Sequence, residues 1–429
     1  MSTIAAIATG ASVSAIGIVR LSGPMAIEAV SRLFAPMPKE DRKLAYGELR
    51  SAEGELLDMC LCQVSHAPAS YTGEDTAELQ CHGSPVVLRA VLDELFRLGV
   101  RQALPGEFTK RAFLNGKMEL TSAEAVADLI DAQTAEAAKN AAGQLSGAID
   151  RKTDEIYSGL ADICAHFHAV LDYPDEDIPD FLMATYQQQL TSGIASLDAL
   201  LKSFRRGKHM NSGIPTAIIG RPNAGKSSLL NALLGYDRAI VTANPGTTRD
   251  TIEEKLVLGG LCLRLIDTAG IRETDDEAEK LGVDRSIVAA ENAELVINII
   301  DGTTDDTPMS PDYLAVYNKC DLPSFHGGEI AISARTGEGL DKLEQAILAR
   351  FPVPDVPAGE ILTNARQAQA VQTALEYLCA ALEAMETGAT PDIVLTEVEG
   401  AMTAIGELNG RTVREDVTNR IFARFCVGK

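Results

Sequence analysis

Residues 220–227, Gly-Arg-Pro-Asn-Ala-Gly-Lys-Ser, have the types and spacing of a loop that holds phosphate. They follow the apolar stretch "TAIIG" and precede a helical pattern. Glycines allow backbone N–H groups to turn toward an anion, and Lys226 adds a positive charge at the β- and γ-phosphates. The Ser227 hydroxyl is suited to hold Mg²⁺. The other loop residues expected to contact the nucleotide are Asn223, Ala224, Gly225 and Ser228.

A second motif predicts which base is bound. "NKCD" (318–321) follows the strand-like "YLAVY". The Asp321 carboxylate can accept from N1–H and the 2-amino group of guanine, whereas adenine offers neither donor. "ISA" (332–334) follows at a distance that brings a backbone N–H to guanine O6. The residues expected to contact the base are Asn318, Lys319, Asp321, Ser333 and Ala334.

Two further motifs lie between these and complete a GTPase order. In "GTTRD" (246–250), Thr248 is expected to place a second hydroxyl on Mg²⁺. In "DTAG" (267–270), Asp267 is expected to act on Mg²⁺ through water, and the Gly270 N–H to sense the γ-phosphate. The sequence therefore predicts GTP and Mg²⁺ as ligands.

The residue that orients the attacking water is not the usual one. Ras-like proteins have a glutamine after D-T-A-G, and here Ile271 stands at that position. Its side chain can neither orient water nor transfer a proton. An acidic run follows, and most of its carboxylates are expected to be a solvated surface. The candidates are Glu273, Asp275, Asp276, Glu277 and Glu279.

Composition limits the class of protein. With 429 residues, 46% of them apolar and 23% charged, the chain is predicted to be soluble and multidomain. A net charge of −23 excludes a protein that holds nucleic acid by bulk positive potential. The eight scattered cysteines indicate a reducing compartment, so a cytoplasmic location is expected. No apolar run is long enough to predict a membrane span.

The pattern of elements predicts multidomain α/β and α architecture. Residues 1–118 form an α/β domain, 119–211 the first part of a helical domain, 212–352 a doubly wound, Ras-like G domain, and 353–429 the second helical part. Each helical part looks incomplete, which predicts one helical domain interrupted by the G domain. Thr121 and Glu124 fit a capping box. Only fifteen residues separate "DG" (301–302) from "NKCD", so a G-domain helix is expected to be shortened or absent.

Taken together, the motifs resemble one family. They are "SYTGEDTAELQCHG" (70–83), "PGEFTKRAFLNGKMEL" (105–120), "DYPDEDIPDF" (172–181), the phosphate loop with "GTTRDT", and the terminal "FCVGK" (425–429). Over nearly its full length the chain resembles the bacterial tRNA modification GTPase MnmE (TrmE) family.

The resemblance implies a homodimer joined through an N-terminal folate-binding domain. It implies an FAD-dependent partner protein, in a heterotetramer, with which the chain modifies wobble uridine in tRNA. The group installed is carboxymethylaminomethyl or aminomethyl, and a 5-formyl- or methylene-tetrahydrofolate derivative supplies the one-carbon unit. GTP turnover is expected to be stimulated by K⁺.

The family motifs also imply roles for particular residues. Glu279 would be the water-orienting glutamate, which answers the problem of Ile271. Arg249 and Arg272 are less favoured as arginine fingers, because K⁺ can supply that charge. The implied K⁺ ligands are Asn223, Thr242, Asn244 and Thr247, of which both threonines would also contact the nucleotide. The implied folate-binding residues are Arg20, Glu78, Lys117 and Lys429.

The C-terminal "FCVGK" has three interpretations. Lipidation is disfavoured by glycine and lysine at the last two positions. A frayed tail is usual for a terminus. Here Val417, Ile421 and Phe425 are predicted to share a helical face, with Phe422 beside them, and to dock the end. We therefore expect Cys426 to be functional, as nucleophile, acid–base group or positioning group.

Other features leave alternatives open. Cys164 and His168 could bind a metal, although helix packing is favoured, and Cys60 and Cys62 are expected in a core. "ATGASVSAIGIVR" (8–20) departs from the glycine- and arginine-rich stretch usual in the family. Two other functions remain possible, a GTP-gated assembly or RNA-binding switch and a stand-alone folate enzyme with a regulatory G domain.

Overall fold

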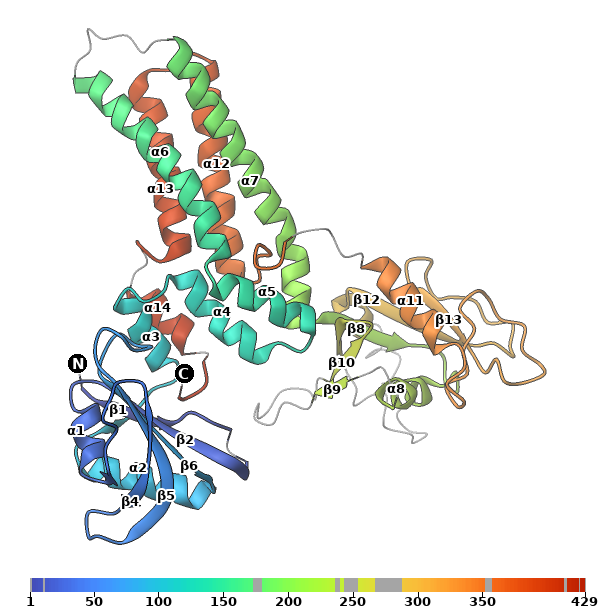
Figure 1. Cartoon of the computed structure of the whole chain (residues 1–429). Helices are drawn as coiled ribbons and strands as arrows, with labels where there is room; N and C mark the ends of the chain where they lie inside the picture. Colours follow the sequence, from blue (N-terminus) through green and yellow to red (C-terminus); the bar gives the residue numbers. More distant parts are fainter. Residues whose placement is uncertain are drawn as a thin grey trace. The chain divides into compact units, whose positions relative to one another are not determined.

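The computed structural model describes residues 2–10, 12–172, 180–235, 240–242, 254–266, 288–351, 357–412, 415–423 and 425–428 (Figure 1). The chain forms two compact units. The first contains residues 1–127, 150–157 and 402–429, and the second contains 128–149 and 158–401. These two units divide the chain differently from the four predicted domains. The last 28 residues, predicted as helical domain, belong with the N-terminal sheet.

The first unit is built on a seven-stranded sheet of order β3-β4-β5-β6-β2-β1-β7. All neighbouring strands are antiparallel except the parallel pair β1 and β7. The strands are β1 (Ile4–Ile7), β2 (Ser14–Ser22), β3 (Phe34–Ala35), β4 (Leu44–Arg50), β5 (Leu56–Ser65), β6 (Thr76–Gly83) and β7 (Arg101–Gln102).

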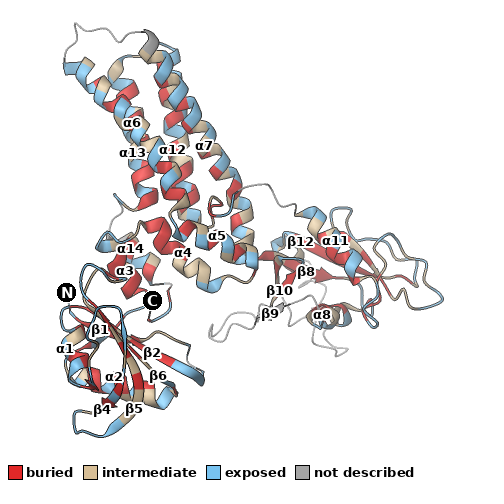
Figure 2. Cartoon of the chain, viewed as in Figure 1, coloured by how far each residue is buried: buried red, intermediate tan, exposed pale blue. Residues whose placement is uncertain are grey.

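Two helices, α1 (Ala26–Ser31) and α2 (Pro85–Arg97), pack on one face of this sheet. Alternate strand residues point to that face, since side chains alternate along a strand. They form a core with the apolar stripe of α2 (Figure 2). Cys60 and Cys62 lie in this core, 3% and 0% exposed, which confirms the interpretation of these cysteines. The mixed α/β prediction for this part is confirmed.

The end of the chain packs on the same unit. Phe422, the last residue of α14 (Glu415–Phe422), and Phe425 are buried in one apolar cluster with Leu120. Phe113 of α3 (Glu107–Leu114) packs against this cluster. The predicted docking of the terminus is therefore confirmed, with one difference. Phe425 lies beyond the helix, and Phe422 is the more deeply buried of the two phenylalanines.

The predicted capping box is wrong. Helix α4 (Leu120–Asp131) already includes Thr121, so this residue is not the N-cap. The Thr121 hydroxyl instead donates to the carboxylate of Asp150, near the start of α6 (Ala148–Asp172). Ser122 donates to the other carboxylate oxygen of Asp150 at 3.1 Å. A tertiary contact has taken the hydroxyl that the local pattern assigned to a cap.

The helices of the second unit come from segments that precede and follow its sheet in the sequence. Helix α7 (Asp180–Ser212) precedes the sheet, and α12 (Ala365–Glu386) follows it and lies along α7 (Figure 1). Asn140 and Gln144, in α5 (Ala135–Leu145), both donate to the Ile361 carbonyl, at 3.1 and 2.5 Å. Helix α13 (Pro391–Asn409) follows α12. Helices that precede the sheet in the sequence therefore pack against segments that follow it.

The second sheet has six strands in the order β13-β12-β8-β11-β10-β9. Strands β8, β11, β12 and β13 are parallel, and β10 and β9 continue the sheet antiparallel. Helices α8 (Lys226–Leu234) and α11 (Leu340–Arg350) pack on one face. The strands are β8 (Ile214–Ile219), β9 (Ile240–Thr242), β10 (Glu254–Leu258), β11 (Leu261–Leu265), β12 (Leu295–Asp301) and β13 (Leu314–Asn318).

No helix lies between β12 and β13, whose connecting residues 302–313 are all described. This confirms the prediction that a helix is shortened or absent at this place, since the connection contains none. The connection is held by side chains, with the Met309 N–H donating to Asn298 Oδ1 at 2.8 Å and the Thr303 N–H to Asp301 Oδ1 at 3.0 Å. Prolines at 308 and 311 also oppose a helix here.

Candidate functional site

The phosphate-binding loop joins β8 to α8 through a sharp turn. Asn223 has a φ of +63° and Gly225 a φ of +103°. A Cβ on Gly225 would lie 2.2 Å from Nδ2 of Asn318, so only glycine fits this position. Ala224 is buried, and α8 begins at Lys226. The N-terminus of α8 therefore presents backbone N–H groups at the loop, as anion binding requires.

Lys226 lies over the loop that precedes it. Its Nζ donates to the carbonyl oxygens of Gly220 at 2.9 Å and Arg221 at 3.1 Å. Burial lowers the pKa of the Lys226 ammonium. Ser227 and Ser228 follow in the first turn of α8.

One side chain connects three of the predicted motifs. Nδ2 of Asn318 donates to the carbonyl of Ala224 at 2.9 Å, and the Ala334 N–H donates to Oδ1 of Asn318 at 2.9 Å. Asn318 is 4% exposed, and Ser333, beside Ala334, is fully buried. The structure thus brings the phosphate loop, "NKCD" and "ISA" to one place.

The two charged residues of "NKCD", Lys319 and Asp321, are paired with side chains that the sequence did not single out. Nζ of Lys319 donates to Oδ2 of Asp301 at 2.5 Å. Burial alone would raise the pKa of Asp301, but its bonds to Lys319 and Thr303 lower that pKa overall. Oδ2 of Asp321 lies 3.1 Å from Nη2 of Arg335. Arg335 directly follows Ser333-Ala334, and this adjacency is the sequence signal that could have identified it.

Several predicted residues cannot be placed. Thr242 is in β9, but its side chain is not described. The predicted site residues outside the described part of the chain are Asn244, Thr247, Thr248, Asp267, Gly270, Glu279 and Lys429, together with Arg249 and Arg272.

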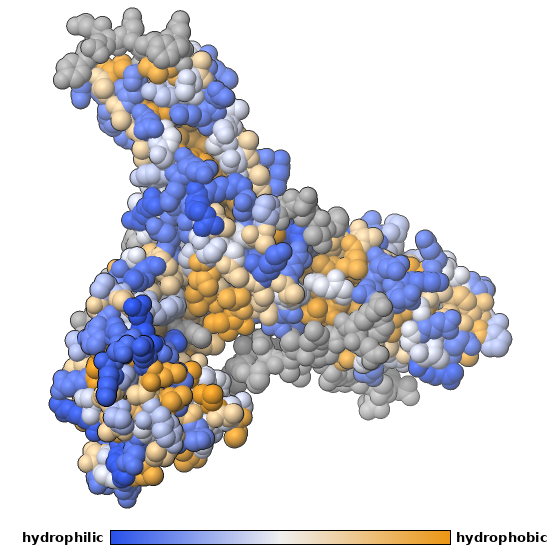
Figure 3. All heavy atoms as spheres, viewed as in Figure 1, coloured by the Kyte–Doolittle hydropathy of each residue, from blue (hydrophilic) through white to orange (hydrophobic). Residues whose placement is uncertain are grey.

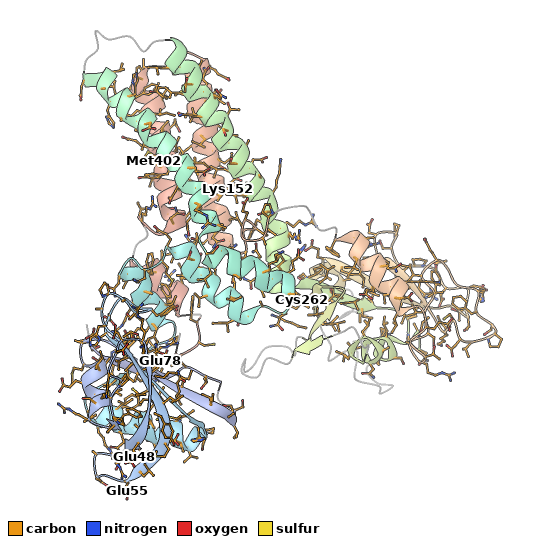
Figure 4. The ribbon with its side chains drawn as sticks, viewed as in Figure 1. Glu48, Glu55, Glu78, Lys152, Cys262 and Met402 are labelled. Carbon is orange, nitrogen blue, oxygen red and sulfur yellow. The ribbon has the colours of Figure 1, made fainter. Side chains whose placement is uncertain are left out.

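Two of the candidate folate residues meet in the first unit. Arg20 of β2 is directly paired across the strands with Glu78 of β6, and Glu78 is labelled in Figure 4. Their side chains lie on the sheet face opposite α1 and α2, with Nε of Arg20 2.7 Å from Oε1 of Glu78. The Arg20 guanidinium carbon is 5.8 Å from the ring centres of both Tyr71 and Phe108. This is a charged pair beside aromatic rings.

Lys117 and the C-terminal residues approach from other segments. Nζ of Lys117 donates to the Pro68 carbonyl at 3.0 Å, so Lys117 does not join the Arg20–Glu78 pair. Cys426 is exposed, and its carbonyl accepts from the Gly106 N–H at 3.3 Å. Val427 forms a β-bridge with Pro105. The backbone of Cys426 is therefore anchored at Gly106, which precedes Phe108 by two residues in the sequence.

The atypical stretch near the N-terminus presents apolar side chains to solvent. Val13 is 84% exposed and Ile16 57%. Figure 3 shows apolar side chains, in orange, on the surface of this unit. This stretch thus exposes apolar side chains near the start of β2.

The Cys164 and His168 pair lies in a different setting from a metal site. Cys164 is 8% exposed, and burial raises the pKa of its thiol to about 11. Nε2 of His168 lies 3.0 Å from Oε1 of Glu399. Within the described ranges, no group of three His, Cys, Asp or Glu residues could hold a metal. None of the helices in those ranges could cross a membrane.

Sequence comparisons place the chain in a family. A model of the MnmE helical domain matches residues 120–426, and a model of the GTP-binding protein TrmE N-terminus matches residues 3–117. The chain belongs to the MnmE family. As a member of this family the chain is a GTPase, in keeping with its nucleotide motifs.

Curated relatives support this membership over the full length. The tRNA modification GTPase MnmE of Akkermansia muciniphila is 42% identical over 443 residues, covering 100% of this chain and 99% of the relative. That of Symbiobacterium thermophilum is 40% identical over 458 residues, with the same coverage. Among solved structures, the G domain of the T. maritima FeoB iron transporter is 25% identical and covers 32% of this chain and 98% of its own. Its TM-score of 0.22 is too low to carry an argument.

Proposed function

We propose that this MnmE-family GTPase uses K⁺-stimulated GTP hydrolysis to drive folate-dependent modification of wobble uridine in tRNA. It acts as a cytoplasmic homodimer with an FAD-dependent partner in a heterotetramer, and adds a carboxymethylaminomethyl or aminomethyl group. The observation that best supports the nucleotide part is Asn318, whose two hydrogen bonds join the phosphate loop to "ISA".

The residues present fit a guanine nucleotide and Mg²⁺. The N–H groups at the start of α8 and the Lys226 ammonium would bind the phosphates. Asp321 would accept from N1–H and the 2-amino group of guanine. The hydroxyl of Ser227, with Thr248 and Asp267, gives the oxygen donors that Mg²⁺ prefers. The ion would neutralise charge that develops between the β- and γ-phosphates.

The K⁺ and water-orienting roles rest on the family motif. Asn223 has a side-chain oxygen at the exposed rim of the phosphate loop, and Thr242, Asn244 and Thr247 would add further oxygens. A bound cation would supply positive charge where other GTPases use an arginine finger. The Glu279 carboxylate would orient the attacking water.

The first unit offers groups that fit a folate. The Glu78 carboxylate can pair with the amide-like donors of a pterin ring, and the rings of Tyr71 and Phe108 lie beside its partner Arg20. Arg20, Lys117 and Lys429 would attract the glutamate tail. The bound folate would supply the one-carbon unit. Cys426, held close to α3, would act beside it.

The test is GTP hydrolysis by the full chain in KCl and in NaCl at matched ionic strength. We expect a large K⁺-selective acceleration that Glu279→Ala abolishes while leaving GDP binding intact. Equal rates in the two salts would contradict the K⁺ mechanism and favour a GTP-gated assembly switch. Modification of tRNA is tested separately, by mass spectrometry of wobble uridine after incubation with the FAD-dependent partner and a tetrahydrofolate derivative.

A further inference from the structure

The guanine-specifying carboxylate is engaged by an arginine. The Asp321 side chain is 14% exposed, and its Oδ2 lies 3.1 Å from Nη2 of Arg335. The Arg335 side chain is 80% exposed, so it can move away without disturbing any packing. Across the described ranges, no second ion pair involves Asp321.

The backbones of both loops are fixed, so the pair does not result from a loose turn. The Cys320 N–H donates to the Ile332 carbonyl at 3.0 Å, next to Asp321. The Ala334 N–H is held by Asn318, and the Ser333 N–H donates to the Glu338 carbonyl at 2.8 Å. Arg335 follows these anchored residues directly. Rotation of the arginine side chain is therefore the movement that can open the pair.

Guanine needs the same carboxylate. Bidentate pairing with N1–H and the 2-amino group uses both oxygens of Asp321 on the side that faces the base. We infer that Arg335 competes with guanine for Asp321: it occupies Oδ2 in the empty site and is displaced when guanine binds. This inference rests on the proposed guanine contact of Asp321.

Two consequences follow from this competition. An ion pair with one exposed partner is weak, so its competition lowers the apparent affinity for GDP by at most ~5-fold. The lower affinity appears as slower association of GDP, because only the fraction of molecules with Asp321 unpaired can bind the base. Adenine has an acceptor at N1 and no 2-amino group, so it cannot replace the guanidinium.

The experiment measures association and dissociation of fluorescent GDP by stopped flow with the full chain. We expect Arg335→Ala to bind GDP ~2- to 5-fold more tightly through faster association. Arg335→Lys keeps a competing cation and should stay near wild type. Arg350→Ala removes a G-domain arginine that donates to the Asp312 carbonyl, and serves as the control for loss of charge. Weaker GDP binding in Arg335→Ala would overturn the inference, since it would mean that Arg335 supports the bound base.

A second background separates this inference from the guanine contact itself. In Asp321→Asn, xanthosine diphosphate should replace GDP as the preferred ligand, because an amide can donate to the xanthine 2-oxo group. Adding Arg335→Ala to that background should no longer change affinity. A persistent gain there would overturn the competition. An unchanged base preference in Asp321→Asn would instead contradict the proposed guanine contact.

Discussion

The side-chain amide of Asn318 donates to the backbone carbonyl of Ala224 at 2.9 Å, across 94 positions of the chain. The phosphate loop is therefore anchored to the strand end that carries Asp321, the aspartate proposed to contact guanine. The buried Asn318 side chain thus holds the phosphate loop and the "ISA" segment together.

Asn318→Ala should weaken GDP binding ~10- to 100-fold and lower the melting temperature of the GTPase. The substitution leaves the Ala224 carbonyl and the Ala334 N–H without their partner, and each unpaired buried group costs about 1–3 kcal/mol. Isothermal titration with GDP and a thermal melt check this. Asn292→Ala is the matched control, since Asn292 is exposed and donates to the Val288 carbonyl one helical turn away. Equal effects of both variants would contradict the bridging role.

Lys226→Met should reduce GTP hydrolysis ~100-fold or more while leaving the fold unchanged. The substitution removes the side-chain cation proposed to bind the β- and γ-phosphates. Burial already lowers the pKa of this ammonium, so the neutral side chain should be tolerated. Steady-state phosphate release and circular dichroism are the measurements. Lys202→Met, on the exposed side of α7, should hydrolyse GTP at the wild-type rate.

Glu78→Gln should weaken binding of 5-formyl-tetrahydrofolate ~10-fold or more. The amide can no longer accept two charge-assisted bonds from a pterin, and it leaves Arg20 without its ion-pair partner. Fluorescence or calorimetric titration measures this. Glu48→Gln is the control. Glu48 and its ion-pair partner Arg50 both lie in β4, another strand of the same sheet. If Glu78→Gln bound 5-formyl-tetrahydrofolate with wild-type affinity, Glu78 would not be part of the folate site.

Glu107 predicts how the first unit responds to acid. Burial alone would raise the pKa of Glu107, but bonds from Arg101, Leu104 and Arg111 outweigh it and lower the pKa to about 2, from an ordinary value of 4.5. Its stabilising contribution is complete above pH 4.5 and is lost as the pH falls toward 2. Glu107→Gln should therefore cost about 2 kcal/mol at pH 7 and progressively less below pH 4.5.

Urea unfolding at pH 7, 5, 4 and 3 measures the difference from wild type. Glu48→Gln again serves as the control, since its exposed pair should give a small difference at every pH. A gap between wild type and Glu107→Gln that grows on acidification would contradict the assignment.

The parts predicted correctly from sequence are those set by local spacing. The phosphate loop needs glycine at 225 because its φ is +103°, and that requirement is visible in the motif. The missing helix between β12 and β13 follows from a short, proline-containing connection. The core positions of Cys60 and Cys62 follow from strand alternation.

The parts that were missed depend on partners far apart in the chain. The Thr121 hydroxyl bonds to Asp150, 29 residues away, so the local capping pattern misled. Register places Arg20 opposite Glu78, 58 residues apart, which no spacing rule reveals. Asp321 meets Arg335 because two loops are held side by side by Asn318. In each case the decisive contact is tertiary.

The docking of Phe422 and Phe425 on the N-terminal unit has a consequence for synthesis. Leu120 and Gly106 leave the ribosome roughly 300 residues before the segment that covers them. At about 5–20 residues per second, they wait roughly 15–60 s. The N-terminal unit is thus completed only after residues 422–426 have been synthesised, and its apolar seam is a natural target for chaperones during that interval.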